Sequence, residues 1–510
     1  MIFDGTGKPG FVGNVLVEGD RIRKIIPADC RLPLPSADRV IDATGCLVTP
    51  GFIDAHTHSD AYLVIEPDAP SKISQGITTE INGQCGGSVA PRYGEARLSS
   101  DWAAVLGDRL TWHSLAEYRT VLEAARPAVN TVQFIGHNTL RSSVVGYAGR
   151  SATAEEQREM ERLLAQALDE GGWGLTTGLI YQPGKYSTPA EVVALAKVAA
   201  KRGGFYATHM RSEGDAILEA IDEVIELVKA TGIRAEISHL KTSGRRNWHK
   251  IDAVLDKIES AMAEGLLLGS DRYPYCAAGT DLDVLLPDWA QEGAAKAECE
   301  RLADASLRAR IVSEVRALDR DWSTVMIGGT WHPDNKRYSG RTVAEIGGDP
   351  GELVCSMLEK DACKTGAFFF GMSEENLAKI YSRPWIVPGS DASLRAPWGP
   401  LGADHPHPRA YATMPEFYRR VRELGFTREA TIARMTSVPT ERFGIRERGT
   451  LVCGSFADIV VWKEEDFKAK ATFTDPHRFT SGVVCTMVNG TIPYLNGKFT
   501  GDRGGRFLER

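Results

Sequence analysis

The sequence predicts an α/β fold: a (β/α)8 TIM barrel with a small β-sandwich domain built from both chain termini and an insertion, or lid, over the barrel mouth. Three observations predict this. Short apolar strands alternate with amphipathic helices through the middle of the chain, which is typical of a parallel sheet. Both ends of the chain are instead rich in strands and turn signals. Between about residues 277 and 348 the alternation loosens into a charged, helical segment.

The strand-rich ends predict one separate small domain. The expected strands are apolar or alternating runs at residues 13–18, 21–26, 40–43, 457–462 and 483–488. Gly19-Asp20 and Asn489-Gly490 are turn signals at the ends of two of these runs. Because the two ends share this character, we expect residues 1–47 and 445–510 to form one β domain and residues 48–444 to form the barrel.

The middle of the chain supplies enough strands for a closed barrel. Its eight expected strands lie at 52–55, 76–81, 131–136, 175–178, 205–208, 235–238, 266–271 and 385–387, and its clearest helices at 154–170, 189–201, 213–230 and 251–264. In the helix at 154–170, apolar side chains recur at helical spacing from Met160 to Leu168. A doubly wound sheet is the competing fold, but no Gly-x-Gly-x-x-Gly follows the first strand.

Composition narrows the class of protein. The 510 residues are 43% hydrophobic and 25% charged, ordinary values for a soluble globular protein, and the net charge is −7. No block of Lys or Arg indicates nucleic acid, no apolar run indicates a membrane span, and Met1-Ile2-Phe3-Asp4 does not open a signal peptide. The nine cysteines are scattered without a regular framework. We therefore expect a cytoplasmic protein whose cysteines are buried or bind metal.

Side chains that bind metals follow the expected strands. His56 and His58 follow the first strand, two residues apart, so an extended backbone directs both the same way. The others, each just after a later strand, are Cys85, His209, His239 and Asp391. Because the carboxyl ends of barrel strands meet at one rim, we expect all six groups to lie together. Neutral imidazole and thiolate suit zinc, and imidazole also suits nickel or iron.

Each of these residues also has a simpler explanation. A His at a strand end often makes only a structural hydrogen bond, a single Cys is usually a small buried hydrophobic residue, and an Asp after Gly-Ser often caps a helix. Six such coincidences at the same end of successive strands are much less probable than any one alone. His137 follows another strand, and both pocket lining and structural hydrogen bonding remain open for it.

The arrangement of these residues resembles the amidohydrolase superfamily. No lysine stands where many members carry a carbamylated one. The segment Gly76–Gly86, which contains Cys85, instead looks like the cysteine-bridged branch, the D-aminoacylases or N-acyl-D-amino-acid deacylases. Further stretches that resemble this family are 178–184, 208–213, 238–241, 406–409, 449–461 and 488–490. The resemblance runs nearly from end to end of the chain.

The resemblance implies a function and a set of roles. It implies zinc-dependent hydrolysis of N-acyl-D-amino acids, in which water activated by the metal attacks the amide carbonyl and Asp391 acts as general acid and base. It implies a tight zinc bound by Cys85, His209 and His239, and a second, weaker site at His56 and His58 that shares Cys85 and that Asp391 contacts. It implies that Lys241, Tyr273 and Arg409 hold the substrate carboxylate and that Tyr181 lines the pocket. Arg409 can bind a carboxylate through two hydrogen bonds, with Lys241 as a point charge.

Two departures from the family pattern qualify these expectations. Similar proteins usually have one more strand before Asp4, so we expect the start of this chain to be short. An extended segment, residues 392–405, separates Asp391 from Arg409, so Arg395 or His405 is expected to share the substrate role.

Two other functions remain as alternatives. One is a hydantoinase-like or isoaspartyl-dipeptidase-like amidohydrolase that acts on cyclic amides or dipeptides, and the cysteine bridge and Arg409 argue against it. The other is a non-catalytic amidohydrolase-like scaffold, and the filled site positions argue against that. The expected partner is a small-molecule N-acyl amino acid, with no nucleic acid and no membrane.

Overall fold

A parallel barrel lies at the centre of the molecule. The computed structural model describes residues 1–30, 35–98, 103 and 105–510. Its barrel strands are β4 (Phe52–Asp54), β5 (Ile77–Asn82), β6 (Asn130–Gln133), β7 (Ile135–Gly136), β8 (Gly174–Gly178), β9 (Phe205–His209), β10 (Arg234–Ile237), β11 (Leu268–Arg272) and β15 (Ile386–Pro388). β6 and β7 are one strand interrupted at Phe134, so the barrel has the eight strands that the sequence predicted.

Neighbouring strands of the barrel pair in parallel from β4 to β15, in two sheets that meet where β6 continues into β7. The pairing runs without a gap from β4 through β5, β6/β7, β8, β9, β10 and β11 to β15. The circle closes between the last strand and the first, where Ala55 donates a backbone hydrogen bond of 3.1 Å to Pro388. The carboxyl ends of all the strands therefore face one mouth, as in other closed (β/α)8 barrels.

Helices surround the barrel. They are α1 (Tyr62–Ile65), α2 (Pro70–Ile73), α4 (Leu115–Ala125), α5 (His137–Val144), α6 (Ala154–Asp169), α7 (Pro189–Lys201), α8 (Ile217–Thr231), α9 (Ile251–Ala263), α16 (Glu374–Tyr381), α17 (Arg409–Glu423), α18 (Arg428–Met435) and α19 (Ser437–Phe443). Local sequence sets their starts: α6 begins with a capping box between Thr153 and Glu156, and α7 has Pro189 in its first turn behind the cap Thr188. The apolar face of α6, from Met160 to Leu168, is buried as its spacing predicted.

Strands from both termini form two sheets beside the barrel. One sheet is the hairpin β1 (Gly13–Glu18) and β2 (Arg21–Pro27), and the other has the order β19-β18-β17-β16-β3, with β3 (Leu47–Pro50), β16 (Ile459–Trp462), β17 (Val483–Val488), β18 (Thr491–Leu495) and β19 (Lys498–Phe499). Ile22 of the hairpin shares a core with Val48 and Ile459 of the larger sheet. At the turn between β17 and β18, Asn489 and Gly490 both have positive φ, as a two-residue hairpin requires.

Two segments near the termini differ from the prediction. Residues 40–43 form no strand, and the Val40 side chain is 82% exposed. At the other end, residues 504–508 leave the β domain and lie along the barrel, where Leu508 donates a hydrogen bond to the Thr131 carbonyl. The apolar run at 40–43 thus predicted a strand, but these residues pair with no strand in the part of the chain that the structure describes.

The insertion is longer than the segment 277–348 that the sequence predicted. It contains β12 (Ala278–Asp281), α10 (Asp288–Gln291), α11 (Ala294–Ala303), α12 (Ala305–Arg316), β13 (Val325–Ile327), α13 (Pro333–Lys336), α14 (Val343–Ile346), α15 (Pro350–Lys360) and β14 (Gly366–Phe369). Because β14 pairs with both β12 and β13, the unit closes only near residue 369. It has its own hydrophobic core, which includes Leu285, Val315 and Leu358.

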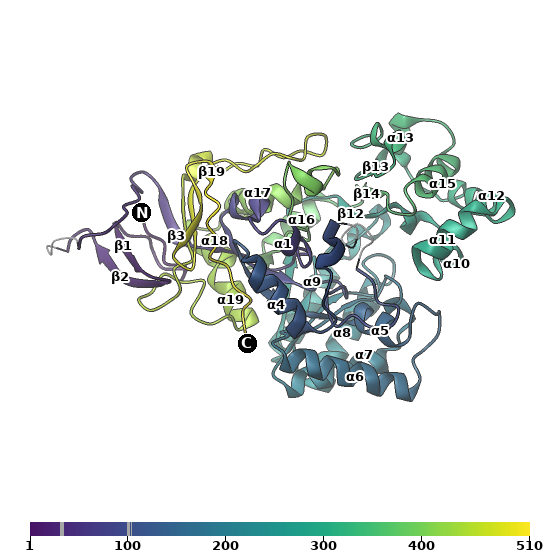
Figure 1. Cartoon of the computed structure of the whole chain (residues 1–510), viewed down its shortest axis with the longest axis horizontal. Helices are drawn as coiled ribbons and strands as arrows, with labels where there is room; N and C mark the ends of the chain where they lie inside the picture. The colour runs from purple at the N-terminus through teal and green to yellow at the C-terminus, as the bar shows by residue number, and fades with distance from the viewer. Residues whose placement is uncertain (31–34, 99–102, 104) are drawn as a thin grey trace.

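Figure 1 shows how these parts are arranged. The β domain and the insertion lie at opposite ends of the molecule, with the barrel and its helices between them. Within the described residues, no helix is long and apolar enough to cross a membrane.

Candidate metal centre

Six side chains of the predicted site lie at the carboxyl ends of barrel strands. His56 and His58 follow β4, Cys85 follows β5, His209 ends β9, His239 follows β10, and Asp391 follows β15. Three of them, Cys85, His239 and Asp391, have positive φ values of 51°, 38° and 49°. A left-handed backbone is unfavourable for a residue with a β-carbon, by about 1–3 kcal/mol, and persists where the surrounding structure enforces it. The loops after three strands therefore hold their functional side chains at a cost in backbone energy.

Cys85, His209 and His239 form one group of candidate ligands. One donor atom from each lies within 4.8 Å of the others. Cys85 Sγ is 3.3 Å from His239 Nε2. Both ring nitrogens of His209 are buried and make no hydrogen bond. A buried imidazole without a hydrogen bond is costly by itself, so the geometry suits a bound metal ion.

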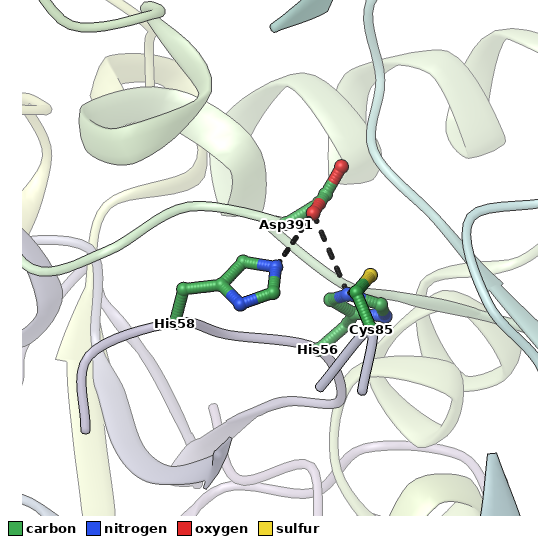
Figure 2. A group of neighbouring side chains, drawn as sticks. All are labelled: His56, His58, Cys85 and Asp391. Carbon is green, nitrogen blue, oxygen red and sulfur yellow. Dashed lines mark hydrogen bonds and ion pairs between the residues drawn. The ribbon is translucent and has the colours of Figure 1, made fainter. Parts of the chain in front are cut away.

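His56, His58 and Asp391 form a second group with the same cysteine. Asp391 Oδ1 lies 3.0 Å from His58 Nε2 and 3.4 Å from His56 Nε2, and Cys85 Sγ is 3.3 Å from His56 Nε2. Figure 2 shows both imidazoles directed toward the Asp391 carboxylate, with the Cys85 side chain beside His56. Cys85 thus belongs to both groups, which is the arrangement that a cysteine-bridged pair of metal sites needs.

The electrostatics of the centre favour ionised Cys85 and Asp391. Burial opposes ionisation of the Cys85 thiol, but His56, His239 and His209 lower its pKa well below the usual value. Burial likewise opposes ionisation of Asp391. Its pKa is nevertheless well below 3.8, because Arg409 and three histidines stabilise the carboxylate: His239, His58 and His56. A thiolate and a carboxylate are therefore both available as ligands at neutral pH.

A cavity of about 560 Å³ opens above the two groups. It is lined by His58, Cys85, His209, His239 and Asp391 and by the predicted substrate residues Tyr181, Lys241, Tyr273, Arg395 and Arg409, whereas His56 is not exposed to it. The insertion contributes Trp331 and Phe368 to the wall. The structure thus brings every predicted site residue to one place, with His56 beneath the cavity floor.

Three predicted substrate residues meet near the centre. The Arg409 guanidinium lies 4.5 Å above the Tyr273 ring, and Arg409 Nη1 is 2.7 Å from Asp391 Oδ2. Lys241 Nζ lies 5.9 Å from the centroid of the same ring. Burial raises the pKa of Tyr273, but Lys241, Arg272 and Arg409 lower it more, so the net shift is downward. A positive surface thus faces the cavity beside Asp391, suited to a carboxylate.

Arg395 and His405 line the cavity but already have protein partners. Arg395 Nε lies 3.1 Å from Asp404 Oδ2, and its guanidinium stacks 4.8 Å from the Tyr62 ring. His405 Nε2 donates to the Phe473 carbonyl at 2.7 Å. These contacts favour a structural role in shaping the wall over the substrate role expected for either residue.

Sequence reasoning missed two acids in the centre. Asp271 ends the run 266–271, one of the eight expected strands, and accepts from His56 Nδ1 at 3.1 Å and from the His239 backbone at 3.0 Å. The rule that metal-site groups follow strands would have found it. Glu213 contacts His209, His239 and Lys241 from the loop before α8. No strand precedes Glu213 directly, so only the fold shows its position.

His137 lies outside the cavity. Its Nε2 is 2.9 Å from Glu191 Oε1, and Arg141 Nη1 contacts both oxygens of the same carboxylate. Of the two explanations left open for this residue, the structure favours structural hydrogen bonding.

Comparison with known proteins identifies close relatives. The profile of an amidohydrolase family, Amidohydro_3, matches residues 39–494. The chain is 35% identical to an N-acyl-D-glutamate deacylase of Alcaligenes xylosoxydans xylosoxydans, over all of this chain and 95% of that protein. It is 32% identical to a D-aminoacylase of the same organism, over all of this chain and 96% of that protein.

Solved structures show the same likeness. An N-acyl-D-glutamate deacylase from Bordetella bronchiseptica, complexed with zinc and a phosphonate that mimics the tetrahedral intermediate, matches with a TM-score of 0.83 and 31% identity, over 100% and 98% of the two chains. A D-aminoacylase studied for its binuclear metal centre, with activation by one metal and attenuation by the second, matches with a TM-score of 0.83 and 32% identity over the same shares. A D-hydantoinase from Thermus sp. matches with a TM-score of 0.57 and 15% identity, over 100% and 97% of the chains, and shares the fold.

Proposed function

The chain belongs to the amidohydrolase family, and we propose that it is a zinc-dependent enzyme that hydrolyses the amide bond of N-acyl-D-amino acids to a carboxylic acid and a free D-amino acid. The observation that carries the proposal is the buried group of Cys85, His209 and His239, which shares its cysteine with a second group at the barrel mouth. The likeness of the full chain to deacylases, one of which was solved in complex with zinc, supports the choice of metal and reaction.

The proposed ligands divide into two sites. Cys85, His209 and His239 hold the tight zinc, and His56 and His58 serve a second, weaker site that shares Cys85 and that Asp391 contacts. Thiolate and imidazole donors match the ligand preference of zinc. A zinc ion bound there would polarise the amide carbonyl and lower the pKa of a water molecule, which would allow hydrolysis at neutral pH.

Asp391 is the proposed general acid and base. Its low pKa keeps the carboxylate ionised at neutral pH, so it accepts the proton of the attacking water and passes it to the nitrogen of the leaving amine. Arg409, 2.7 Å from Asp391, also faces the cavity, where it binds the substrate carboxylate together with Lys241 and Tyr273. Tyr181, whose ring centroid lies 4.9 Å from that of His209, also lines the cavity.

The remaining assignments belong to the same proposal. Residues 1–50 and 445–503 form the small β domain, because β3 extends to Pro50, three residues beyond the boundary expected from the sequence. Residues 51–444 form the hydrolase domain, and the insertion at 278–369 forms one wall of the cavity. All nine cysteines are free thiols, which supports a cytoplasmic location. The proposed preference for the D enantiomer rests on the relatives, which are an N-acyl-D-glutamate deacylase and a D-aminoacylase.

The alternatives have less support. The D-hydantoinase likeness, at 15% identity, supports the fold and not a cyclic-amide substrate. A scaffold without catalysis is disfavoured because all six metal-site positions are filled and lie together.

Two alanine variants test the division of the metal sites. We expect His209→Ala to lose both the tight zinc and amine release, because it removes one of three proposed ligands. We expect His56→Ala to keep one zinc per chain. The measurement is zinc content by elemental analysis after dialysis, alongside amine release from an N-acetyl-D-amino acid. A His56→Ala protein without zinc would show that the two sites are assigned in reverse, and a wild-type protein without zinc would support the scaffold.

A further inference from the structure

Glu213 is a buried acid that the proposed reaction does not use. It lies between β9 and α8, four residues after His209, and its side chain is 10% exposed. Its carboxylate contacts His239 on the nitrogen opposite to the one that faces Cys85.

The two carboxylate oxygens of Glu213 reach both histidines of the proposed tight site. Oε1 lies 2.9 Å from His239 Nδ1, and Oε2 lies 3.4 Å from His209 Nε2. The opposite nitrogen of His239, Nε2, is the one that faces Cys85 at 3.3 Å. A single carboxylate therefore accepts a hydrogen bond from His239, which favours one orientation of that imidazole, and also lies beside the His209 ring.

Lys241 competes for the same nitrogen of His239. Its Nζ lies 2.8 Å from His239 Nδ1 and also donates to Glu213 Oε1. An ammonium group is only a donor, so a hydrogen bond from Lys241 to Nδ1 would require Nδ1 to be unprotonated. A neutral ring would then carry its proton on Nε2, and that nitrogen could not bind a metal. Glu213 removes the conflict, because it accepts from both the lysine and Nδ1.

We propose that Glu213 is a positioning residue that holds His239 in the tautomer needed to bind zinc and keeps Lys241 from reversing that tautomer. This inference rests on the proposed metal site at Cys85, His209 and His239. Under this inference Lys241 has two successive partners. It pairs with Glu213 in the free enzyme, and it binds the substrate carboxylate from the cavity when substrate is present.

The test measures zinc affinity, not only activity. Metal-free wild type, Glu213→Gln, Lys241→Met and the double variant are titrated with zinc against a chromophoric chelator. The amide introduced by Glu213→Gln has one donor end in place of a second acceptor, so in either orientation it presents a donor to one of the two histidines. We therefore expect Glu213→Gln to raise the zinc dissociation constant about 10–100-fold, the usual effect of removing such a support. Lys241→Met should keep the wild-type zinc affinity while raising KM.

The double variant isolates the competition between Lys241 and Glu213. Without the lysine, its ammonium no longer donates to His239 Nδ1, so we expect Glu213→Gln/Lys241→Met to bind zinc more tightly than Glu213→Gln alone. Glu223→Gln is the matched control, since Glu223 of α8 pairs with Arg211 at 2.9 Å and contacts no candidate ligand. It should leave zinc affinity unchanged.

The outcomes separate this inference from the proposed function. Wild-type zinc affinity in Glu213→Gln, or a defect confined to KM as in Lys241→Met, would overturn the positioning role even if the enzyme is a zinc hydrolase. A double variant no better than Glu213→Gln would overturn the tautomer argument. Failure of the wild type to bind zinc would instead count against the proposed function. Nitrogen chemical shifts of the His239 ring report the tautomer directly in each variant.

Discussion

Cys85 is the residue on which the two ligand groups meet. Its sulfur lies 3.3 Å from His56 Nε2 and 3.3 Å from His239 Nε2. One side chain therefore contacts a histidine that follows β4 and another that follows β10, two strands that are not neighbours in the barrel. A φ of 51° places the thiol at this point. We therefore expect removal of the sulfur to disturb both proposed sites, and removal of His56 or His209 to disturb one.

A second single residue, Asp391, offers a test of the proposed proton transfer through the variant Asp391→Asn. Asparagine keeps the size of the side chain but cannot accept a proton, so we expect kcat to fall about 10²–10⁴-fold. Zinc content should remain at least one per chain, because Asp391 is not a member of the Cys85, His209 and His239 group. Steady-state kinetics and elemental analysis on one preparation provide both values. A variant with full zinc and wild-type kcat would exclude Asp391 as the acid and base.

How far the site could be predicted follows from where each residue lies. His56, Cys85, His239 and Asp391 were predictable because each follows a strand, and a barrel brings strand ends together. The pairing of Arg395 with Asp404 and the contacts of Glu213 were not predictable, because both depend on how long loops pack over the barrel mouth. No local pattern encodes those contacts.

At the scale of secondary structure, a buried ion pair joins two of the barrel's outer helices. Arg141 of α5 contacts both oxygens of Glu191 in α7, at 2.7 and 2.6 Å, and His137 contacts the same carboxylate. Arg141 is fully buried. Burial disfavours the Glu191 carboxylate, but His137 and Arg141 lower its pKa below 4.5.

The lowered pKa of Glu191 gives a pH-dependent prediction. A carboxyl with a lower pKa in the folded state stabilises the fold above its unfolded pKa of about 4.5 and loses that contribution as pH falls through the folded pKa. We expect Glu191→Gln to lower the free energy of unfolding at pH 7 by about 3 kcal/mol, because it leaves Arg141 buried and unpaired. The difference from wild type should shrink as pH is lowered below about 4.5.

Thermal unfolding followed by circular dichroism between pH 7 and pH 3.5 measures this difference. The control is Glu159→Gln, whose partner Arg162 is largely exposed, so little stability is expected to be lost. A constant difference between Glu191→Gln and wild type at every pH would contradict the assignment of the lowered pKa to the native ion pair.

The strands and helices of the barrel were predictable where the spacing of apolar residues in the sequence matched the side chains that are buried in the fold. The helix predicted at 189–201 has those bounds, and the helix predicted at 154–170 ends one residue earlier, at 169. The end of the insertion was not predictable, because β14 pairs with β12 across about 85 residues of chain and nothing near residue 348 indicates that return. Non-local antiparallel pairing leaves no periodic signal in the sequence.

In the whole molecule, the three parts shown in Figure 1 contribute differently to the candidate site. The barrel holds the candidate ligands, the insertion supplies one wall of the cavity, and the β domain lies at the far end. Active sites of such barrels lie at the carboxyl ends of the strands, where loops vary without disturbing the core. Differences in substrate between this chain and its relatives should therefore map to the insertion and to residues 392–405.

The most direct measurement of the central claim uses enantiomer pairs. Purified protein is assayed for amine release from N-acetyl-D- and N-acetyl-L-amino acids with acidic, polar and apolar side chains, each with and without a zinc chelator. The proposal predicts release from D substrates only, loss of that release with the chelator, and recovery when zinc is restored. Equal rates on both enantiomers, or full activity after the metal is removed, would contradict it.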